Sequence, residues 1–346
     1  MKKTGIRING RGNAWPIPLG QQHPLYSLTP EPDYANASFS LMSLNQVESR
    51  TEVNWELLID AGHGTIPMLL KTHNRLPEAI VLTHPHFDHF VGVDWIAQSH
   101  YRFKNKLRYP LYATPLCWET LVSSLPHLEK IIEFKCLDYG HSRIPDEIPG
   151  VELTAYPVYH GTSAYGAAMI VADVMNAGNT KQKIIFSGDL LCPLIRETDY
   201  AHLQGAKYLF ADVNNRFPYP RANHWSFVPE SSEDFLGAWL KDITIKDLFL
   251  PHLSNDKGPV LPEYLELLMK DGCRTKDMYW SLLEWIKRFS PEKILLVHYS
   301  GREDEKYHDE PLMDGPQLEA WTQQQAVAKG IHCEFRVPET GDWLEF

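Results

Sequence analysis

Residues 81–89 read Val81-Leu82-Thr83-His84-Pro85-His86-Phe87-Asp88-His89, which places three histidines and one aspartate within six positions. The apolar run before them, Ala79–Leu82, predicts a strand that ends at Thr83. Side chains two positions apart on extended backbone project to the same side, so His84 and His86 are expected to point together. Asp88 and His89 follow where the chain turns into a helix-like segment, Val91–Gln98.

A binuclear metal site is the chemistry that this segment indicates. Imidazole and carboxylate are suitable ligands for zinc and similar divalent ions, and four such groups supply about half of a binuclear site. The alternative is a solvated, histidine-rich loop. The strand before the motif and the turn after it favour the metal site, as do the 16 histidines of the 346-residue chain.

The composition is that of a soluble globular protein, with 43% hydrophobic and 22% charged residues. Short apolar, β-branched runs occur along the chain together with single helical periods, which predicts a layered α/β fold. No linker or repeat stands out, so we expect a single domain over residues 1–346. The predicted strands are Trp55–Ile59, Ala79–Thr83, Val151–Val158, Ala168–Ala172, Lys183–Phe186, Tyr208–Ala211, Asp247–Leu250 and Lys293–Val297. The predicted helices are Val91–Gln98, Pro126–Phe134, Ser232–Leu240, Pro262–Met269, Met278–Phe289 and Pro316–Lys329, and a closing strand is expected near Phe335–Val337.

The His-x-His-x-Asp-His motif at residues 84–89 resembles the signature of the metallo-β-lactamase fold superfamily. The resemblance implies an αββα sandwich, in which helices flank two mixed β-sheets and a dinuclear metal site lies at the edge of the sheets. That family needs a further His, Asp and His, each after a strand, and this sequence offers His160, Asp189 and His298 in that order. Asp60-Ala61-Gly62 matches the family's Asp-x-Gly element, whose Asp usually supports a ligand without binding metal.

The resemblance also implies how two divalent ions would be held. One ion would take His84, His86 and His160, the other would take Asp88, His89 and His298, and Asp189 would bridge them. Zn²⁺ is expected, with Mn²⁺ or Fe²⁺ as alternatives. A metal-bound hydroxide would be the nucleophile, and Asp88 could orient it as well as bind metal.

The last ligand has two candidates, because His252 also follows a strand-like run, Asp247–Leu250. His298 is preferred, since a long helical pattern precedes it and a helix and a closing strand follow it, as at the end of the family's domain. His252 would then lie at the rim of the site or on the surface.

The N-terminal segment Gly10-Arg11-Gly12-Asn13-Ala14-Trp15-Pro16-Ile17-Pro18 resembles the opening of one branch of the superfamily, which contains tRNase Z and the cyclic phosphodiesterases of phosphonate breakdown. Ala37–Leu41 is similar to the next strand of that branch, and His298-Tyr299-Ser300 to its terminal motif. The resemblance implies phosphodiester hydrolysis, in which two metals clamp the phosphate and an acid protonates the leaving alkoxide.

The acid in this branch is often a histidine on a loop, and His224 is the nearest candidate. The surrounding Asn223-His224-Trp225-Ser226 departs from the family's usual pattern. Counted back from His298, the usual place of the acid holds Cys273. A rim or structural role for His224 therefore stays open, and so does the loss or replacement of the donor.

The net charge of −11 and the pI of about 5.8 argue against broad binding to nucleic acid or to anionic membranes. Arg102–Arg108 is the densest basic stretch, and a solvated insertion is favoured for it over an RNA contact. We therefore expect a small anionic substrate, such as a cyclic nucleotide or cyclic phosphate, with extended nucleic acid disfavoured. The aromatic segment Asn214–Trp225 would either roof the site and stack on a base or simply pack the loop down.

Several other functions would keep the same fold. A tRNase Z-like ribonuclease and a hydrolase of a lactone, thioester or other ester would use the same metal site. An oxygen-binding diiron redox protein would normally need a flavin-binding partner or domain. A non-catalytic assembly protein is disfavoured, because every ligand position holds a residue of the right type.

Five scattered cysteines without a Cys-x-x-Cys pair predict reduced thiols and not a disulfide scaffold. Neither a signal peptide nor an apolar run of transmembrane length is apparent, so a cytoplasmic location and no membrane partner are expected. The sequence carries no signal of oligomeric state, although homodimers are frequent in the branch that it resembles.

Overall fold

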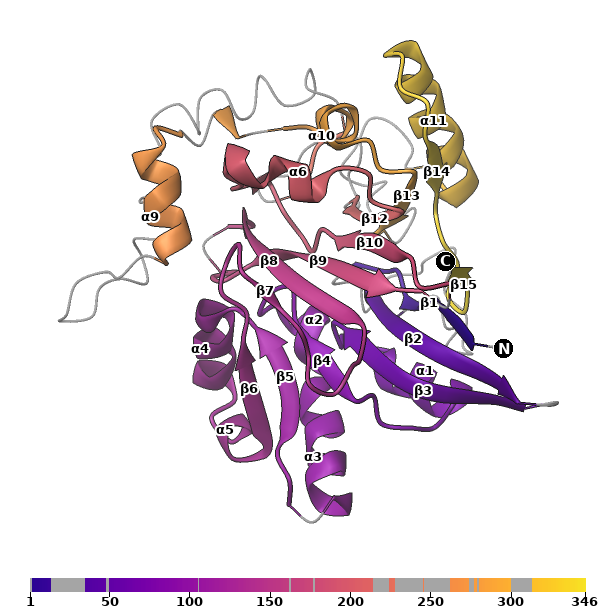
Figure 1. Ribbon diagram of the computed structural model, residues 1–346, viewed down its shortest axis with the longest axis vertical. Helices are drawn as coiled ribbons and strands as arrows, with labels where there is room; N and C mark the ends of the chain where they lie inside the picture. Colours follow the sequence, from indigo (N-terminus) through magenta and orange to yellow (C-terminus); the bar gives the residue numbers. More distant parts are fainter. Residues whose placement is uncertain are drawn as a thin grey trace, which may run out of the picture.

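The structure is a computed structural model, and two β-sheets packed face to face form its centre (Figure 1). Helices lie on the outer faces of this pair. The residues that the structure describes are 2–13, 35–47, 50–104, 106–161, 163–176, 178–213, 224–227, 245, 262–273, 277–278, 280–299 and 313–346.

The first sheet joins an antiparallel part to a parallel part. Its strands are β1 (Lys2–Gly10), β2 (Ser38–Val47), β3 (Arg50–Ile59), β4 (Ala79–Val81), β5 (Tyr109–Ala113), β6 (Ile132–Cys136) and β15 (Trp343–Glu345). They are ordered β15-β1-β2-β3-β4-β5-β6. Pairing is antiparallel from β15 to β3 and parallel from β3 to β6, so the carboxyl ends of β3, β4 and β5 meet at one edge.

The second sheet is mixed in the same way. Its strands are β7 (Ser142–Arg143), β8 (Val151–Tyr159), β9 (Ala168–Met175), β10 (Lys181–Phe186), β11 (Cys192–Pro193), β12 (Tyr208–Asp212), β13 (Lys293–Val297) and β14 (Glu334–Arg336). The order is β11-β8-β9-β10-β12-β13-β14, and β7 pairs with β8. Because β10, β12 and β13 run parallel, the residues that follow them also gather at one edge.

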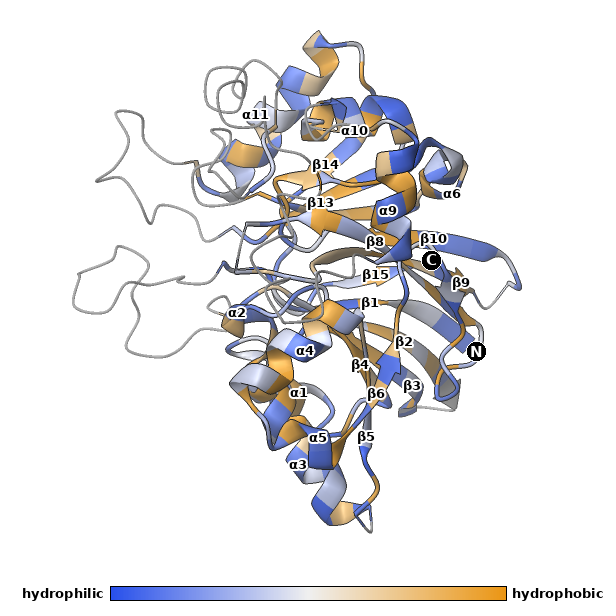
Figure 2. Ribbon diagram, turned by 90° about the vertical axis from the view of Figure 1, so that its left-hand side faces the viewer, coloured by the Kyte–Doolittle hydropathy of each residue, from blue (hydrophilic) through white to orange (hydrophobic). Residues whose placement is uncertain are grey.

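The main apolar core lies between the sheets. Successive side chains of a strand point to opposite faces, so Leu57 of β3 joins this core whereas Leu58 faces the outer helices. Phe39, Phe186 and Phe210 pack together in the core, with ring centroids 4.5 to 5.5 Å apart. Figure 2 shows apolar residues running through the strands of both halves.

The helices of the described residues are α1 (Thr65–Thr72), α2 (Phe87–Phe90), α3 (Val93–Phe103), α4 (Pro115–Ser124), α5 (Leu128–Ile131), η2 (Glu197–Asp199), α6 (Tyr200–Leu203), α9 (Glu263–Lys270), α10 (Leu282–Phe289) and α11 (Gly315–Ala328). On the outer face of the first sheet, Ile96 of α3 and Leu121 of α4 pack against Ile80 and Leu111. α10 begins with a capping box between Ser281 and Glu284 and buries its apolar stripe in the main core. Within the described ranges, no helix is both long and apolar enough to cross a bilayer.

The predicted αββα arrangement of two mixed sheets and flanking helices is confirmed. Eight predicted strands, including the closing one near Phe335–Val337, correspond to observed strands, and Lys293–Val297 matches β13 in both bounds. The largest difference is in β3, which begins at Arg50 and not at Trp55. The predicted helix over Pro126–Phe134 is wrong in its second half. Helix α5 ends at Ile131, and β6 begins at Ile132, where the chain pairs in parallel with β5. The predicted strand Asp247–Leu250 and helix Ser232–Leu240 lie outside the described residues.

Candidate metal centre

The first sheet brings the His-x-His-x-Asp-His segment to its carboxyl edge. β4 is fully buried and ends at Val81, and the extended residues that follow carry His84 into the interior, where it is 0% exposed. His86 precedes α2, and the backbone N–H of His89 donates to the His86 carbonyl over 2.9 Å. This tight turn buries Asp88 and His89 on the same side as His84.

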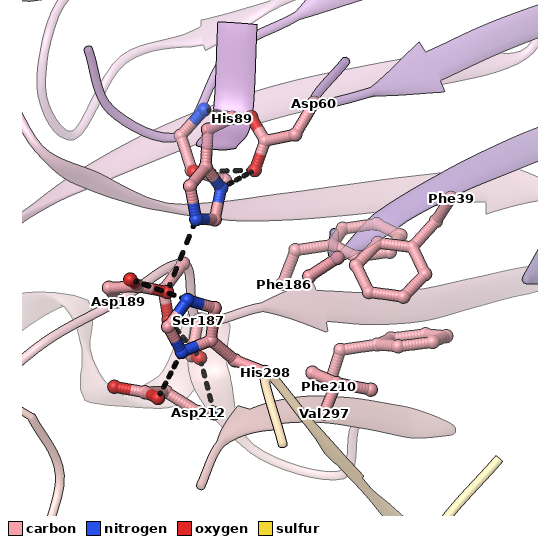
Figure 3. Close-up of a pocket in the computed structure, with 13 residues that line it drawn as sticks. Phe39, Asp60, His89, Phe186, Ser187, Asp189, Phe210, Asp212, Val297 and His298 are labelled. Atoms are coloured by element: carbon pink, nitrogen blue, oxygen red, sulfur yellow. Dashed lines mark hydrogen bonds and ion pairs between the residues drawn. The ribbon is translucent and has the colours of Figure 1, made fainter. Parts of the chain in front are cut away.

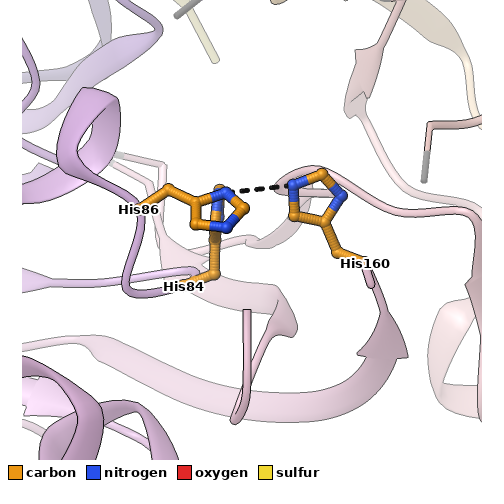
Figure 4. Close-up of side chains that lie close together, drawn as sticks. All are labelled: His84, His86 and His160. Carbon is orange, nitrogen blue, oxygen red and sulfur yellow. Dashed lines mark hydrogen bonds between the residues drawn. The ribbon is translucent and has the colours of Figure 1, made fainter. Parts of the chain in front are cut away.

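Three histidines form the first ligand group (Figure 4). His84 and His86 come from the first sheet, and His160 follows β8 of the second sheet. One nitrogen from each lies within 4.8 Å of the others. Nδ1 of His86 lies 3.2 Å from Nε2 of His160, so these two ring nitrogens face the same point.

Two aspartates and two histidines form the second group: Asp88, His89, Asp189 and His298. Nε2 of His298 lies 3.1 Å from Asp189 Oδ2 and 3.4 Å from Asp88 Oδ2. Nε2 of His89 lies 3.6 Å from Asp189 Oδ1. Both groups are therefore built from residues of both halves of the sandwich.

Asp189 lies between the two groups. Its Oδ2 is 3.8 Å from Nε2 of His84 and 3.5 Å from Nε2 of His160. The same carboxylate faces His89 and His298 of the second group. Gly188 places it there, because this residue has a φ of 58° and a Cβ on it would crowd Cβ of Thr83 at 2.9 Å.

Asp60 lies on the opposite side of His89 from Asp189 and supports the ligands through hydrogen bonds (Figure 3). Its side chain accepts the backbone N–H of Thr83 at 2.8 Å and the Thr83 hydroxyl at 2.7 Å. Its Oδ2 also lies 2.8 Å from Nδ1 of His89, which turns Nε2 of that ring toward Asp189. A carboxylate in this place fixes the tautomer and orientation of a metal-binding imidazole.

Asp212 is a site residue that the sequence interpretation missed. It ends β12, the strand between β10 and β13. Its Oδ2 lies 2.8 Å from Nδ1 of His224, and its Oδ1 lies 3.3 Å from Nδ1 of His298. The available signal was an apolar run that ends in a carboxylate, Tyr208–Asp212, just as Ile184–Phe186 leads to Asp189.

His224 lies beside both ligand groups. Its ring centroid is 4.9 Å from that of His160 and 5.3 Å from that of His298. Its side chain is 12% exposed, so it lines the accessible side of the cluster. Ser163 is a second missed residue, since its Oγ lies 2.9 Å from Nε2 of His86 and fixes that ring from the β8–β9 loop.

The electrostatics of the groups suit divalent cations. Burial lowers the pKa of His84 well below its usual value, so this imidazole is neutral and keeps a lone pair. Burial opposes ionisation of Asp88 and Asp189, but the neighbouring histidines outweigh it and hold the pKa of both carboxyls below the ordinary range. Nε2 of His84 and Nε2 of His89 are buried and have no hydrogen-bond partner within the described part of the chain. Such nitrogens facing carboxylates fit the donor set of a metal ion.

Three further sequence-based expectations concern His252, Cys273 and the aromatic segment Asn214–Trp225. His252 lies outside the described residues, whereas His298 joins the second group. Cys273 packs against an apolar cluster around Leu265 and Leu268, and the ligand groups found among the described residues do not include it. Of Asn214–Trp225, only His224 and Trp225 are described, and Trp225 is fully buried with Nε1 donating to the Trp280 carbonyl at 2.7 Å. This tryptophan packs in the main core, so its ring is not available to stack on a base.

Of the N-terminal motif, only Gly10–Asn13 belong to the described residues, and they lie beside the segment that follows His298. A Cβ on Gly10 would overlap the carbonyl oxygen of Asn36, so only glycine fits there. The backbone N–H of Tyr299 donates to the Arg11 carbonyl over 3.0 Å. Arg11 thus helps to fix the segment that follows His298.

The chain matches a model of a known protein family. The family model described as "Beta-lactamase superfamily domain" matches residues 56–253, which is more than half of the chain. The match begins in β3 and includes six of the seven residues of the two ligand groups. A search of curated proteins found no match.

Solved structures share the fold at low sequence identity. A diphosphatase from the PhnP family superposes with a TM-score of 0.59 at 16% identity, covering 99% of this chain and 98% of that one. Unliganded yeast PDE1 gives a TM-score of 0.54 at 12% identity and covers both chains completely. The metallo-beta-lactamase fold protein YhfI from Bacillus subtilis gives 0.53 at 10% identity, again over the full length of both chains. At these identities the similarity establishes the fold alone.

Proposed function

The chain belongs to the beta-lactamase superfamily, and on this premise we propose that it is a dinuclear metal-dependent phosphodiesterase. Family membership and the buried histidine–aspartate groups support a metal-dependent hydrolase. The more specific proposal is a small phosphodiester substrate, such as a cyclic nucleotide or a cyclic phosphate.

One observation carries the proposal: the carboxylate of Asp189 faces both ligand groups, and His224, held by Asp212, lies beside both. His84, His86 and His160 would hold one ion, while Asp88, His89 and His298 would hold the other. When bound, two such ions polarise phosphoryl oxygens and lower the pKa of water toward neutrality. Zn²⁺ suits these imidazole and carboxylate ligands, and Mn²⁺ or Fe²⁺ are the alternatives.

His224 would act as the general acid for the leaving alkoxide. Breaking a phosphodiester leaves an alkoxide that needs a proton, and a positioned histidine can supply one. The hydrogen bond between Nδ1 of His224 and Asp212 leaves the other ring nitrogen for the substrate. Asp88, which lies 3.4 Å from His298 through its Oδ2, could orient the attacking water as well as bind metal.

Charge supports a small substrate. A net charge of −11 disfavours a long polyanion, which would need an extended basic groove. A single phosphodiester needs only the local positive charge of two ions. The PhnP-family diphosphatase and yeast PDE1 share this fold, and their names are consistent with phosphoryl chemistry at such a site.

A substrate panel tests the proposal. Purified protein loaded with Zn²⁺ or Mn²⁺ would be assayed with bis-p-nitrophenyl phosphate, 2′,3′- and 3′,5′-cyclic nucleotides, a tRNA precursor, a lactone and a thioester. We expect turnover of the small phosphodiesters and its loss in His84→Ala. His141→Ala, a histidine outside both ligand groups, is the matched control and should keep full activity.

Each alternative outcome would contradict a specific part of the proposal. Turnover of the lactone or thioester alone would exclude the phosphodiesterase. Cleavage of the tRNA precursor without turnover of cyclic substrates would indicate a ribonuclease. If metal analysis finds no bound ion and no substrate reacts, the metal-dependent hydrolase itself is wrong.

A further inference from the structure

Two apolar side chains are exposed where the chain passes from α3 to β5. Phe103 is 80% exposed and Leu107 is 63% exposed. The backbone of the turn is hydrogen-bonded, with the N–H of Lys104 donating to His100 over 2.8 Å and the N–H of Leu107 donating to Lys104 over 3.0 Å. These hydrogen bonds hold the backbone of Lys104 and Leu107, beside which both apolar side chains face solvent.

Four cations surround these apolar residues: Arg102, Lys104, Lys106 and Arg108. All four are exposed. In the described part of the structure, none of them forms an ion pair with an acidic side chain. Residues 102–104 and 106–108, the basic–apolar turn, thus reverse the charge locally on a chain whose net charge of −11 argues only against broad binding to anionic surfaces. The exposed apolar pair distinguishes this turn from the solvated insertion that the sequence alone favours.

The topology places the basic–apolar turn away from the metal centre. β4 and β5 are parallel, and His84 follows the carboxyl end of β4, whereas the turn leads into the amino end of β5. The two features therefore lie at opposite edges of the first sheet. Figures 1 and 2 both show the end of α3 at one extremity of the molecule.

We propose that the basic–apolar turn docks the protein on an anionic lipid surface, with Phe103 and Leu107 entering the boundary between head groups and acyl chains. Lys and Arg side chains are attracted to anionic head groups, and adjacent apolar side chains gain by leaving water. The remaining acidic surface is repelled by the same lipids, which orients the molecule with the turn toward the membrane. Since the metal centre lies at the other sheet edge, it stays open to a water-soluble substrate.

The side-chain pattern favours lipid over RNA. Single-stranded nucleic acid is held by aromatic stacking and by a basic groove that follows its backbone. The turn offers one aromatic ring for stacking, and Leu107 would gain nothing from a phosphate backbone. Two exposed apolar side chains among cations instead match the pattern of interfacial membrane binding.

Vesicle co-sedimentation tests this inference with the intact protein. The probes are vesicles of phosphatidylcholine alone and vesicles with roughly a third phosphatidylglycerol. Binding is expected only to the anionic vesicles, and it should weaken as salt rises. Phe103→Ser/Leu107→Ser should weaken the partition onto anionic vesicles about tenfold, and Lys104→Glu/Lys106→Glu should abolish it.

Matched variants separate the turn from general surface effects. Ile144→Ser/Val327→Ser removes two other exposed apolar side chains, and Lys71→Glu/Lys287→Glu makes the same charge change elsewhere. Both controls should bind anionic vesicles as the unmodified protein does. Turnover of bis-p-nitrophenyl phosphate in solution and the melting temperature should be unchanged in all four variants, which distinguishes this inference from the proposed phosphodiesterase activity.

Two results would overturn the inference. One is equal binding, or equal absence of binding, to neutral and anionic vesicles. The other is tight binding of a labelled single-stranded RNA that the turn variants lose while vesicles stay unbound, because the occupant of the turn would then be RNA.

Discussion

Asp212 holds His224 through a 2.8 Å contact between Oδ2 and Nδ1, and its other oxygen lies 3.3 Å from Nδ1 of His298. One buried carboxylate therefore orients both the proposed general acid and a proposed metal ligand. Burial opposes its ionisation, but His224 outweighs this and keeps the pKa of Asp212 below its ordinary value. The two functions of this carboxylate can be separated by substitution.

His224→Ala should remove the proton donor and leave the metal ligands intact. For a cyclic nucleotide, whose leaving group is an alkoxide, we expect kcat to fall roughly 10²- to 10⁴-fold. For bis-p-nitrophenyl phosphate the loss should be much smaller, because p-nitrophenolate leaves without a proton. Kinetics on both substrates and metal analysis check this. An equal loss on both substrates would assign His224 a structural role.

Asp212→Asn should affect both activity and metal affinity. The amide keeps the shape of the carboxylate but loses the charge that orients the rings of His224 and His298. Loss of such a supporting group typically weakens metal binding 10- to 100-fold. Titration with a competing chelator measures it. If Asp212→Asn binds metal as tightly as His224→Ala does, the contact to His298 has no role in ligation.

The ligand groups predict the metal stoichiometry. The unmodified protein should bind two divalent ions per chain, and His84→Ala should lose the ion held by His84, His86 and His160. Elemental analysis after removal of free metal gives the ratio. His63→Ala is the control, because this exposed histidine lies outside both groups. An unchanged metal content in His84→Ala would show that the ligand assignment is wrong.

Gly62 is predicted to tolerate no side chain. A Cβ at this position would overlap the carbonyl oxygen of Asp88, so Gly62→Ala must displace the turn that carries Asp88 and His89. We expect a loss of stability of about 1–3 kcal/mol from overpacking, together with weaker metal binding. Thermal denaturation with and without metal measures both effects. Gly178→Ala, where the nearest atom is Asn176 Oδ1 at 3.4 Å, should change little.

Asp173 is predicted to contribute to stability in a pH-dependent way. Burial opposes its ionisation, but the hydrogen bond to His202 at 2.8 Å and the charge of Lys181 outweigh this and lower the pKa of Asp173. A carboxyl with a lowered folded-state pKa stabilises the fold above its unfolded pKa, and this contribution disappears as pH falls through the folded value.

Asp173→Asn should therefore lose roughly 1 kcal/mol near pH 7 and less than that near pH 3, because the contribution shrinks below the unfolded-state pKa. Urea denaturation at the two pH values measures the difference. Asp94→Asn, which removes an exposed pair with His127, should show a smaller effect at both. A constant difference between pH 7 and pH 3 would contradict the pKa argument.

The sequence predicted the site correctly where a buried strand is followed within a few residues by a ligand. β4, β8, β10 and β13 were all recognisable as apolar runs, and each leads within a few residues to a histidine or aspartate of the site. β10 and β13 each pair in parallel with β12, so the residues after them lie close together. β4 belongs to the other sheet and β8 pairs antiparallel with β9, so the approach of their ligands could be expected only from the family resemblance. The error at Pro126–Phe134 has a local cause, since a short apolar run with two isoleucines fits a helix and a strand equally well.

Asp212 and Ser163 could not be assigned from the sequence. Neither belongs to a motif, and the role of each depends on a partner that is distant along the chain. Asp212 contacts His298 only because β12 pairs with β13, and Ser163 contacts His86 only because the β8–β9 loop crosses to the first sheet. Tertiary pairing of this kind leaves no periodic signal in either segment.

The ligands come from both sheets, and this has a consequence for how the site forms during folding. His84, His86, Asp88 and His89 are neighbours in the chain, whereas His298 reaches them only when β13 has joined the second sheet and the two sheets have docked. Contacts between distant segments form late, because long loops must close first. An ion captured early would be held by one short segment and would exchange rapidly. Tight metal retention is thus a marker that the last long-range contacts have formed.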